Sequence, residues 1–206
     1  MIALLLFHKT KNYIMKENIS WQKALERLKE GNSNFIKDRL DGKLQNSSRR
    51  KELVSGQSPY VIILSCADSR VVPELAFDAG LGELFVIRVA GNVANTSTVA
   101  SIEYAVAHLG VNLIVVLGHE SCGAVTAAIA GGDNGNNLNH LLEHVNPAIE
   151  ASDDKSVNTI VKINAQLTCN EIINKSTIIS DAMKNREIKF VPGFYNLGSG
   201  KVDFID

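Results

Sequence analysis

The sequence has no excess of basic residues, since 21 Lys and Arg stand against 22 Asp and Glu and the net charge at pH 7 is −1. A surface that neutralises a row of phosphates needs such an excess, so nucleic acid and anionic membranes are poor candidates for a partner. Long apolar runs are also missing, because no stretch approaches the roughly 20 residues of a membrane span. We therefore expect a small-molecule substrate and neither a nucleic-acid nor a membrane partner.

Cysteine is scarce as well, with 3 among 206 residues. That is too few for a disulfide scaffold, and an odd number cannot all pair within one chain. The apolar run over residues 1–7 has no basic residues before it and no small-residue cleavage site after it, so it does not match a secretory signal. These features predict a cytoplasmic protein with reduced thiols. Ordinary contents of glycine, proline and apolar residues exclude collagen-like and disordered chains.

Three short apolar runs predict buried strands over residues 60–64, 84–89 and 113–117. They are rich in Val, Ile and Leu without polar alternation, which is typical of a parallel sheet covered on both faces. Between the second and third runs, apolar residues at helical spacing predict a helix over residues 97–109, ended by Gly110. This order of elements indicates a β-α-β unit.

The rest of the chain predicts further helices, loops and one hairpin. We expect helices over residues 20–39, from 123 to 131, over 139–150 and over 156–186 with a break near Ser176, loops over 41–58 and 133–139, and a strand, turn and strand over 188–205. The predicted fold is α/β: a mostly parallel central sheet flanked by helices, with a C-terminal antiparallel edge hairpin and an N-terminal helical arm. Residues 20–206 form one domain, and residues 1–19 form an extension that is either disordered or helical.

Chemically reactive residues directly follow two of the predicted strands. The first strand leads into SCADSR (residues 65–70), and the third leads into GHESCG (residues 118–123). In an open parallel sheet, ligands bind at the carboxyl ends of the strands. Both segments are therefore expected at one site.

Cys66, His119 and Cys122 are donors of the types that zinc binds. Three protein ligands with a fourth position left open are typical of catalytic rather than structural zinc. Taken singly, Cys66 can equally be a small buried apolar residue and His119 a surface residue. Their combination at paired strand ends favours a site for one zinc ion per chain.

Asp68 and Arg70 are two residues apart, so their side chains leave an extended backbone on the same side. Arg70 can then hold the carboxylate of Asp68 through two hydrogen bonds and keep it off the metal. When released, Asp68 could occupy the fourth zinc position and close the site. The alternative is an aspartate that caps the loop beside a solvated arginine.

The pattern Cys66-x-Asp68-x-Arg70 followed by His119-x-x-Cys122-Gly123 resembles the β-class carbonic anhydrases, zinc enzymes that interconvert CO₂ and bicarbonate. Other segments are also similar to that family, and the resemblance covers about residues 20–206. The supporting segments are residues 24–32, 85–92, 101–105 and 193–195.

The resemblance implies zinc held by Cys66, His119 and Cys122, attack of zinc-bound hydroxide on CO₂, and Asp68 with Arg70 as a catalytic dyad. It also implies a narrow apolar pocket for CO₂ or bicarbonate at a subunit interface, and therefore a homodimer or homotetramer. The residues assigned to substrate binding by this resemblance are Gln57, Phe85, Tyr104 and Gly123.

One position departs from part of the family. Some members carry a tryptophan three residues before the first cysteine, which forms a non-catalytic bicarbonate site together with an arginine and a tyrosine. Arg88 and Tyr195 match that arginine and tyrosine, but the tryptophan position is Ile63. The presence of such a site is left open.

Three other functions are compatible with the same residues. The zinc site could hydrolyse another small heterocumulene, COS or CS₂, or it could stabilise a non-catalytic interaction domain. From a different class, Cys122 could be a nucleophile with His119 as its base. Metal analysis combined with a CO₂ hydration assay distinguishes these alternatives.

Overall fold

The computed structural model describes residues 18–205, so residues 1–17 of the predicted N-terminal extension lie outside the described part. Asn18 contacts the folded domain through its side-chain amide, which donates to Pro59 O and Leu109 O. Ile19 packs against an apolar cluster that contains Leu28.

The centre of the fold is a five-stranded sheet with the order β2-β1-β3-β4-β5. The first four strands in this order pair in parallel, and β5 is antiparallel to β4 at the edge. This arrangement confirms the predicted fold class, including the C-terminal edge hairpin. The strands are β1 (Val61–Ser65), β2 (Leu84–Arg88), β3 (Leu113–His119), β4 (Lys189–Tyr195) and β5 (Val202–Phe204).

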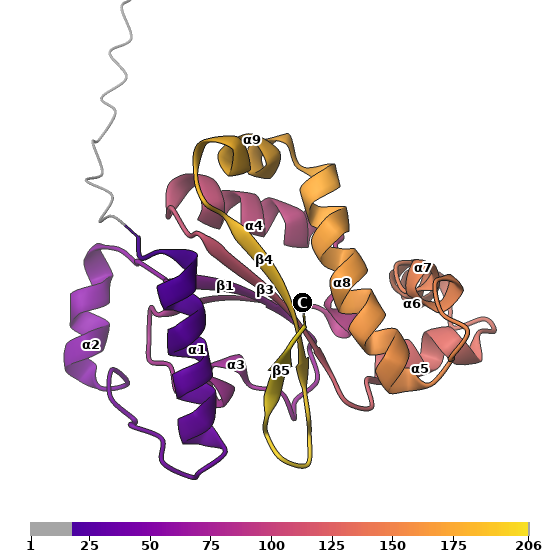
Figure 1. The fold of residues 1–206 in the computed structure, drawn as a ribbon, viewed down its shortest axis with the longest axis horizontal. Coiled ribbons are helices and arrows are strands. Elements are labelled where there is room, and N and C mark those ends of the chain that lie inside the picture. The colour runs from indigo at the N-terminus through magenta and orange to yellow at the C-terminus, as the bar shows by residue number, and fades with distance from the viewer. Residues whose placement is uncertain (1–17, 206) are drawn as a thin grey trace, which may run out of the picture.

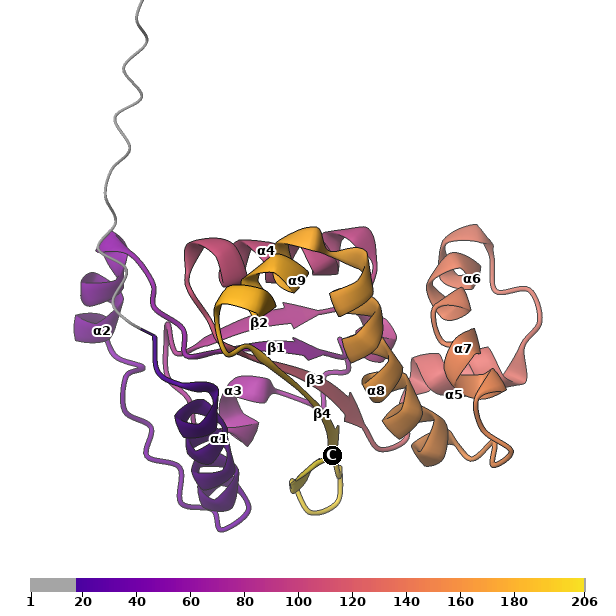
Figure 2. The ribbon, with the colours of Figure 1, turned by 45° about the horizontal axis from the view of Figure 1, so that its top comes forward.

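Helices cover both faces of the sheet, as Figures 1 and 2 show. The α-helices are α1 (Trp21–Phe35), α2 (Ser47–Glu52), α3 (Pro73–Ala76), α4 (Thr96–His108), α5 (Gly123–Ala130), α6 (Asn136–Glu143), α7 (Asn146–Glu150), α8 (Val157–Lys175) and α9 (Thr177–Asn185). Two short 3₁₀ helices, η1 (Leu53–Ser55) and η2 (Ala90–Asn92), complete the described elements. None of the helices in residues 18–205 is long and apolar enough to cross a membrane.

The two faces of the sheet explain why the strand sequences lack polar alternation. Ile62 and Leu64 of β1 belong to the apolar cluster that includes residues of α4, α8 and α9. Val61 and Ile63 of the same strand point to the other face, into the cluster that includes residues of α1 and α3. Because both faces are covered, every residue of β1 is buried.

Several helix boundaries differ from the sequence prediction. The predicted loop over residues 41–58 contains α2, whose first turn is capped by Asn46 accepting from Arg49 N. The predicted helix over residues 139–150 is two helices, because Pro147 has no N–H to continue α6 and lies in the first turn of α7. The predicted break near Ser176 is confirmed, since α8 ends there and Ser176 caps α9.

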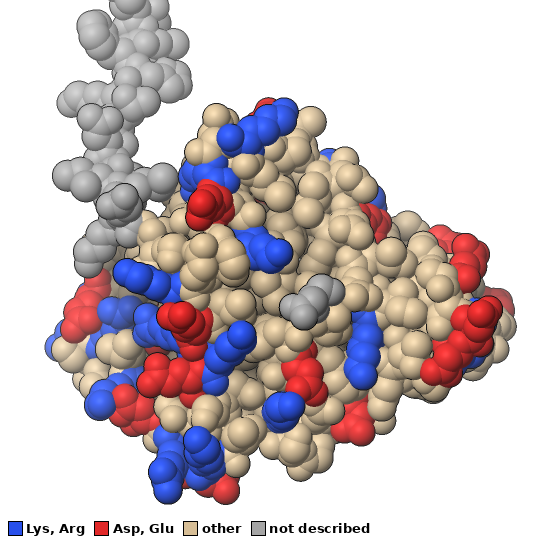
Figure 3. Space-filling model, in the orientation of Figure 1, with Lys and Arg blue, Asp and Glu red and all other residues tan. Residues whose placement is uncertain are grey.

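The face drawn in Figure 3 has no large area of one charge. Lys and Arg side chains alternate with Asp and Glu over the region of α1 and α2, and uncharged residues fill most of the area around β4 and α8.

Gly31 lies inside α1 at the point where this helix meets the segment after α3. A Cβ at this position would be 1.9 Å from Phe77 O and 2.6 Å from Phe77 C, and both are backbone atoms. The next residue, Asn32, is buried and donates to Ala76 O and Gly200 O. The absent side chain of Gly31 therefore allows the close approach that joins α1 to the domain.

We expect Gly31→Ala to lower the free energy of unfolding by roughly 1–3 kcal/mol, because neither backbone segment can move aside without breaking contacts. The better helix propensity of alanine, about 1 kcal/mol, offsets only part of this loss. Denaturant unfolding measures the change. Gly198→Ala is the matched control, because a Cβ there meets nothing within 4 Å. Equal unfolding free energies for the two variants would contradict the prediction.

Candidate metal centre

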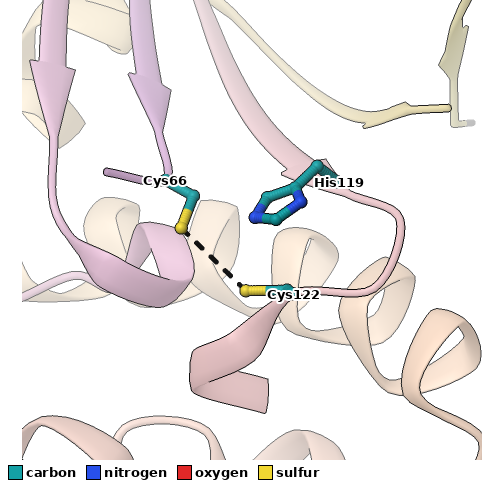
Figure 4. A group of neighbouring side chains, drawn as sticks. All are labelled: Cys66, His119 and Cys122. Carbon is teal, nitrogen blue, oxygen red and sulfur yellow. Dashed lines mark hydrogen bonds between the residues drawn. The ribbon is translucent and has the colours of Figure 1, made fainter. Parts of the chain in front are cut away.

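Two neighbouring parallel strands bring three metal-binding side chains together. Cys66 follows the last residue of β1, His119 is the last residue of β3, and Cys122 immediately precedes α5. The ligand atoms of the three residues all lie within 4.8 Å of one another, and all three residues are buried (Figure 4). The Sγ atoms of Cys66 and Cys122 are 4.0 Å apart, and both thiols are free.

His119 has one ring nitrogen occupied and one available. Its side chain is fully buried, and Nδ1 is 2.9 Å from Glu120 O. Because a carbonyl oxygen only accepts, Nδ1 carries the proton and Nε2 presents a lone pair. Nε2 has no hydrogen-bond partner among the described residues, and Figure 4 shows the ring directed toward the two sulfur atoms. A buried acceptor without a partner beside two thiols fits a zinc ion.

The two thiols have opposite pKa shifts. The Cys122 thiol stabilises the Cys66 thiolate and lowers the pKa of Cys66 to about 4, against the opposing effect of burial. Gly91 N also donates to Cys66 Sγ at 3.4 Å. The same contact with Cys66, together with burial, raises the pKa of Cys122 well above its ordinary value. One sulfur atom of this pair is therefore favoured as a thiolate while the other keeps its proton.

The negative charge of the Cys66 thiolate also shifts the pKa of the His119 imidazole. Burial is the largest influence and lowers the pKa of His119, but the Cys66 thiolate, the Glu120 carbonyl and Asp68 together outweigh it, and the net pKa is raised. The cluster therefore attracts positive charge, which is the property that a cation site requires.

Asp68 and Arg70 form the ion pair that their spacing predicts. Arg70 Nε donates to Asp68 Oδ1 at 3.0 Å, and Nη2 donates to Oδ2 at 2.7 Å. These hydrogen bonds hold the pKa of Asp68 well below its usual range. Arg70 N also donates to Oδ1, so the loop-capping role of Asp68 is present together with the ion pair. Asp68 Oδ2 is 3.8 Å from His119 Nε2, which places the clamped carboxylate next to the candidate metal ligands.

Arg88 makes contacts that the sequence reasoning missed. Its Nε donates to Cys66 O at 2.9 Å, and its Nη2 donates to Asp68 O at 2.6 Å. One guanidinium therefore holds the loop that carries both the first cysteine and the aspartate. The only sequence signal for these contacts was a single arginine near the end of a predicted strand. Ile63 and Tyr195 occupy the other two positions of the non-catalytic bicarbonate site whose presence the sequence leaves open. Both residues are buried in the apolar cluster that includes residues of α1 and α3.

The turn between His119 and Cys122 is fixed by residues from other elements. Ser121 has a φ of 53°, a left-handed conformation that costs a non-glycine residue about 1–3 kcal/mol. Ser121 N donates to Asn158 Oδ1 of α8 at 3.0 Å. On the other side, Glu120 Oε2 accepts from Leu197 N at 2.9 Å. Sequence reasoning assigned no role to Glu120 or Asn158.

The predicted substrate-binding residues lie in three places. Gly123 is the first residue of α5 and follows Cys122 directly. Phe85 of β2 and Tyr104 of α4 are neighbours, with ring centroids 6.3 Å apart, at the β2 edge of the sheet. Gln57 is exposed and precedes the amino end of β1, whereas Cys66 follows its carboxyl end. One chain therefore places Gln57 at the opposite end of β1 from its own cysteine cluster.

Comparisons with known proteins agree with this fold. The sequence profile of the family described as carbonic anhydrase matches residues 61–202, most of the chain. The chain belongs to the β-class carbonic anhydrase family. A similar relative is carbonic anhydrase 2 of Mycobacterium tuberculosis, 37% identical over 185 residues that cover 86% of this chain and 89% of the relative. The carbonic anhydrase of Pseudomonas aeruginosa is 33% identical over 195 residues and covers 84% of each chain.

Solved structures of β-carbonic anhydrases share the architecture. One of the two tetrameric enzymes from Sordaria macrospora superposes with a TM-score of 0.70 at 25% identity, covering 89% of this chain and 97% of that chain. CafA of Aspergillus fumigatus superposes with a TM-score of 0.70 at 26% identity, covering 90% of each chain. This chain is thus a carbonic anhydrase by sequence and by fold, and the sequence resemblance to that family is confirmed.

Proposed function

We propose that this carbonic anhydrase hydrates CO₂ reversibly to bicarbonate and a proton, with one zinc ion held by Cys66, His119 and Cys122. The observation that carries the proposal is the buried donor cluster with the unpartnered His119 Nε2, next to the clamped Asp68. Two soft sulfur donors and one imidazole suit zinc better than the oxygen-preferring magnesium or calcium.

Zinc, when bound, acidifies a water molecule and so supplies a nucleophile near neutral pH. The chain's own residues orient that water. Asp68 is ionised and acceptor-only, so it can accept a hydrogen bond from the water and leave an oxygen lone pair directed at CO₂. Arg70 fixes the direction of the carboxylate through its two hydrogen bonds. Arg88 holds the backbone of the same loop.

We further propose that the active unit is a homodimer or homotetramer. Support comes from Gln57, which is exposed at the end of β1 remote from its own Cys66, and from Tyr104, which is 48% exposed on α4. A second copy can cover these residues and place its own Gln57 near the cluster. The Sordaria macrospora enzymes are described as tetrameric.

Sedimentation velocity at assay concentration should therefore show a dimer or tetramer. Activity per chain should fall when dilution yields monomers, because each pocket then loses the residues of its neighbour. A fully active monomer would contradict the assembly.

Stopped-flow CO₂ hydration together with zinc analysis tests the function. We expect about one zinc per chain, no hydration after removal of the metal with a chelator, and recovery on adding zinc. Faster turnover of COS or CS₂ in the same preparation would instead identify a heterocumulene hydrolase. Zinc-dependent folding without turnover would indicate an interaction domain, and full activity without metal would indicate a cysteine nucleophile.

A cytoplasmic location is also proposed. Its support is that Cys66, Cys122 and Cys169 are all free thiols, the state that a reducing compartment maintains. Cell fractionation with an antibody against the chain tests it.

A further inference from the structure

The segment between His119 and Cys122 must turn the chain from β3 into α5 within two residues. Glu120 N donates to Tyr195 O, and Glu120 O accepts from His119 Nδ1. Ser121 then adopts the left-handed conformation, with φ of 53°. In this conformation the chain reverses between the two candidate ligands, whose donor atoms lie within 4.8 Å of each other.

Serine does not favour this conformation, because a side chain at positive φ crowds the backbone and serine lacks the tolerance of glycine or asparagine. Another group must therefore stabilise the left-handed conformation of Ser121. Ser121 O receives only a long contact of 3.4 Å from Arg70 Nη2. Ser121 N donates to Asn158 Oδ1 at 3.0 Å, a better hydrogen-bond distance.

Asn158 is well placed to act as a fixed support. It is the second residue of α8, the 19-residue helix that packs against both β3 and β4. Asn158 is half-buried, whereas Ser121 and the hydrogen bond between the two residues are exposed to solvent. The support therefore comes from a long helix anchored on the sheet and not from the turn itself.

We propose that Asn158 is a positioning residue for the metal centre: by accepting from Ser121 N, it keeps the turn closed and the spacing of His119 and Cys122 fixed. It touches neither metal nor substrate and acts only through the backbone of Ser121. The inference rests on the proposed zinc site. Loss of a group that orients metal ligands typically reduces metal affinity about 10–100-fold.

The test compares zinc release from the holoenzyme to an excess of a chromogenic chelator. Asn158→Leu, which removes the acceptor at similar size, should release zinc at least about 10-fold faster than wild type. Asn158→Asp keeps an acceptor oxygen and should release zinc at close to the wild-type rate. Asn170→Leu, an exposed asparagine on the same helix, is the matched control and should not change the rate.

A double-mutant cycle separates positioning from a general loss of stability. Glycine at position 121 adopts positive φ without a supporting partner. In the Ser121→Gly background, Asn158→Leu should therefore change zinc release by less than about threefold. Zinc release at the wild-type rate from Asn158→Leu, or an equal acceleration in both backgrounds, would overturn the inference. Should Asn158→Leu not fold, Asn158→Ala takes its place in the same cycle. If the wild type binds no zinc, the proposed function fails together with this inference. If the wild type binds zinc but Asn158→Leu releases it at the wild-type rate, only this inference fails.

Discussion

Replacing His119 with alanine is expected to abolish zinc binding and to reduce CO₂ hydration more than about 100-fold, because the two remaining sulfur donors hold the metal weakly. Cys66→Ser and Cys122→Ser should have the same effect. A hydroxyl does not ionise near neutral pH, so serine cannot replace the thiolate that zinc binds. The three donors lie within 4.8 Å of one another, so removing any one of them leaves an incomplete site.

Metal analysis of the purified variants, alongside stopped-flow hydration, measures this effect. Cys169→Ala is the control, because Cys169 is buried in the α8 side of the core and is not part of the cluster. It should keep its zinc and its activity. Stoichiometric zinc in all three ligand variants would refute the assignment of the metal centre.

Arg70→Ala is expected to lower kcat/KM for hydration roughly 100-fold at every pH, since the positioned carboxylate loses its orientation. In the wild type, Arg70 binds both oxygens of Asp68, whose Oδ2 is 3.8 Å from His119 Nε2. Once released, the carboxylate is free to rotate toward the ligand cluster and compete for the open metal position. Zinc content should stay at one per chain, which separates this effect from loss of the metal.

The low pKa of Asp68 determines how its contributions to stability and activity change with pH. Its pKa is held below the usual range by Arg70, so the carboxylate is ionised throughout neutral and alkaline pH. The contribution of the ion pair to stability is complete above the ordinary aspartate pKa of about 4 and is lost as pH falls through the lower folded-state pKa. In Arg70→Ala the pKa rises, and any acid-side loss of activity that depends on Asp68 should begin at higher pH.

On the alkaline side, we expect wild-type kcat/KM to climb between about pH 7 and 9. The thiolates of Cys66 and Cys122 would offset the charge of a bound zinc ion, so a water on that ion would lose its proton at higher pH than with three neutral imidazoles. A rise in pH would also favour this water over a released Asp68 at the open metal position. A flat profile from about pH 6 to 9, with Arg70→Ala near wild type, would refute this role of the ion pair while leaving the zinc assignment intact.

Local sequence carries enough information to predict the sheet and to select the chemically important side chains. The strand Val61–Ser65 is apolar at every position except its last, and such a run is favourable only where both faces are covered. The ion pair of Asp68 and Arg70 is equally local, because the partners are only two positions apart. Donor type selects Cys66, His119 and Cys122 for zinc, and their role as ligands stays a prediction until metal is measured.

Contacts between residues distant in the sequence account for what could not be predicted. Asn158 is 37 positions from Ser121, and Arg88 is 22 positions from Cys66, so no local pattern pairs them. The same applies to Gly31, whose missing side chain matters only because the backbone of Phe77 lies against it. The strand pattern predicts the fold class, the donor types indicate a zinc site, and the resemblance of the sequence motifs indicates the family. The tautomer of His119, the conformation of Ser121 and the burial of the site depend on hydrogen bonds and packing that exist only after distant segments meet.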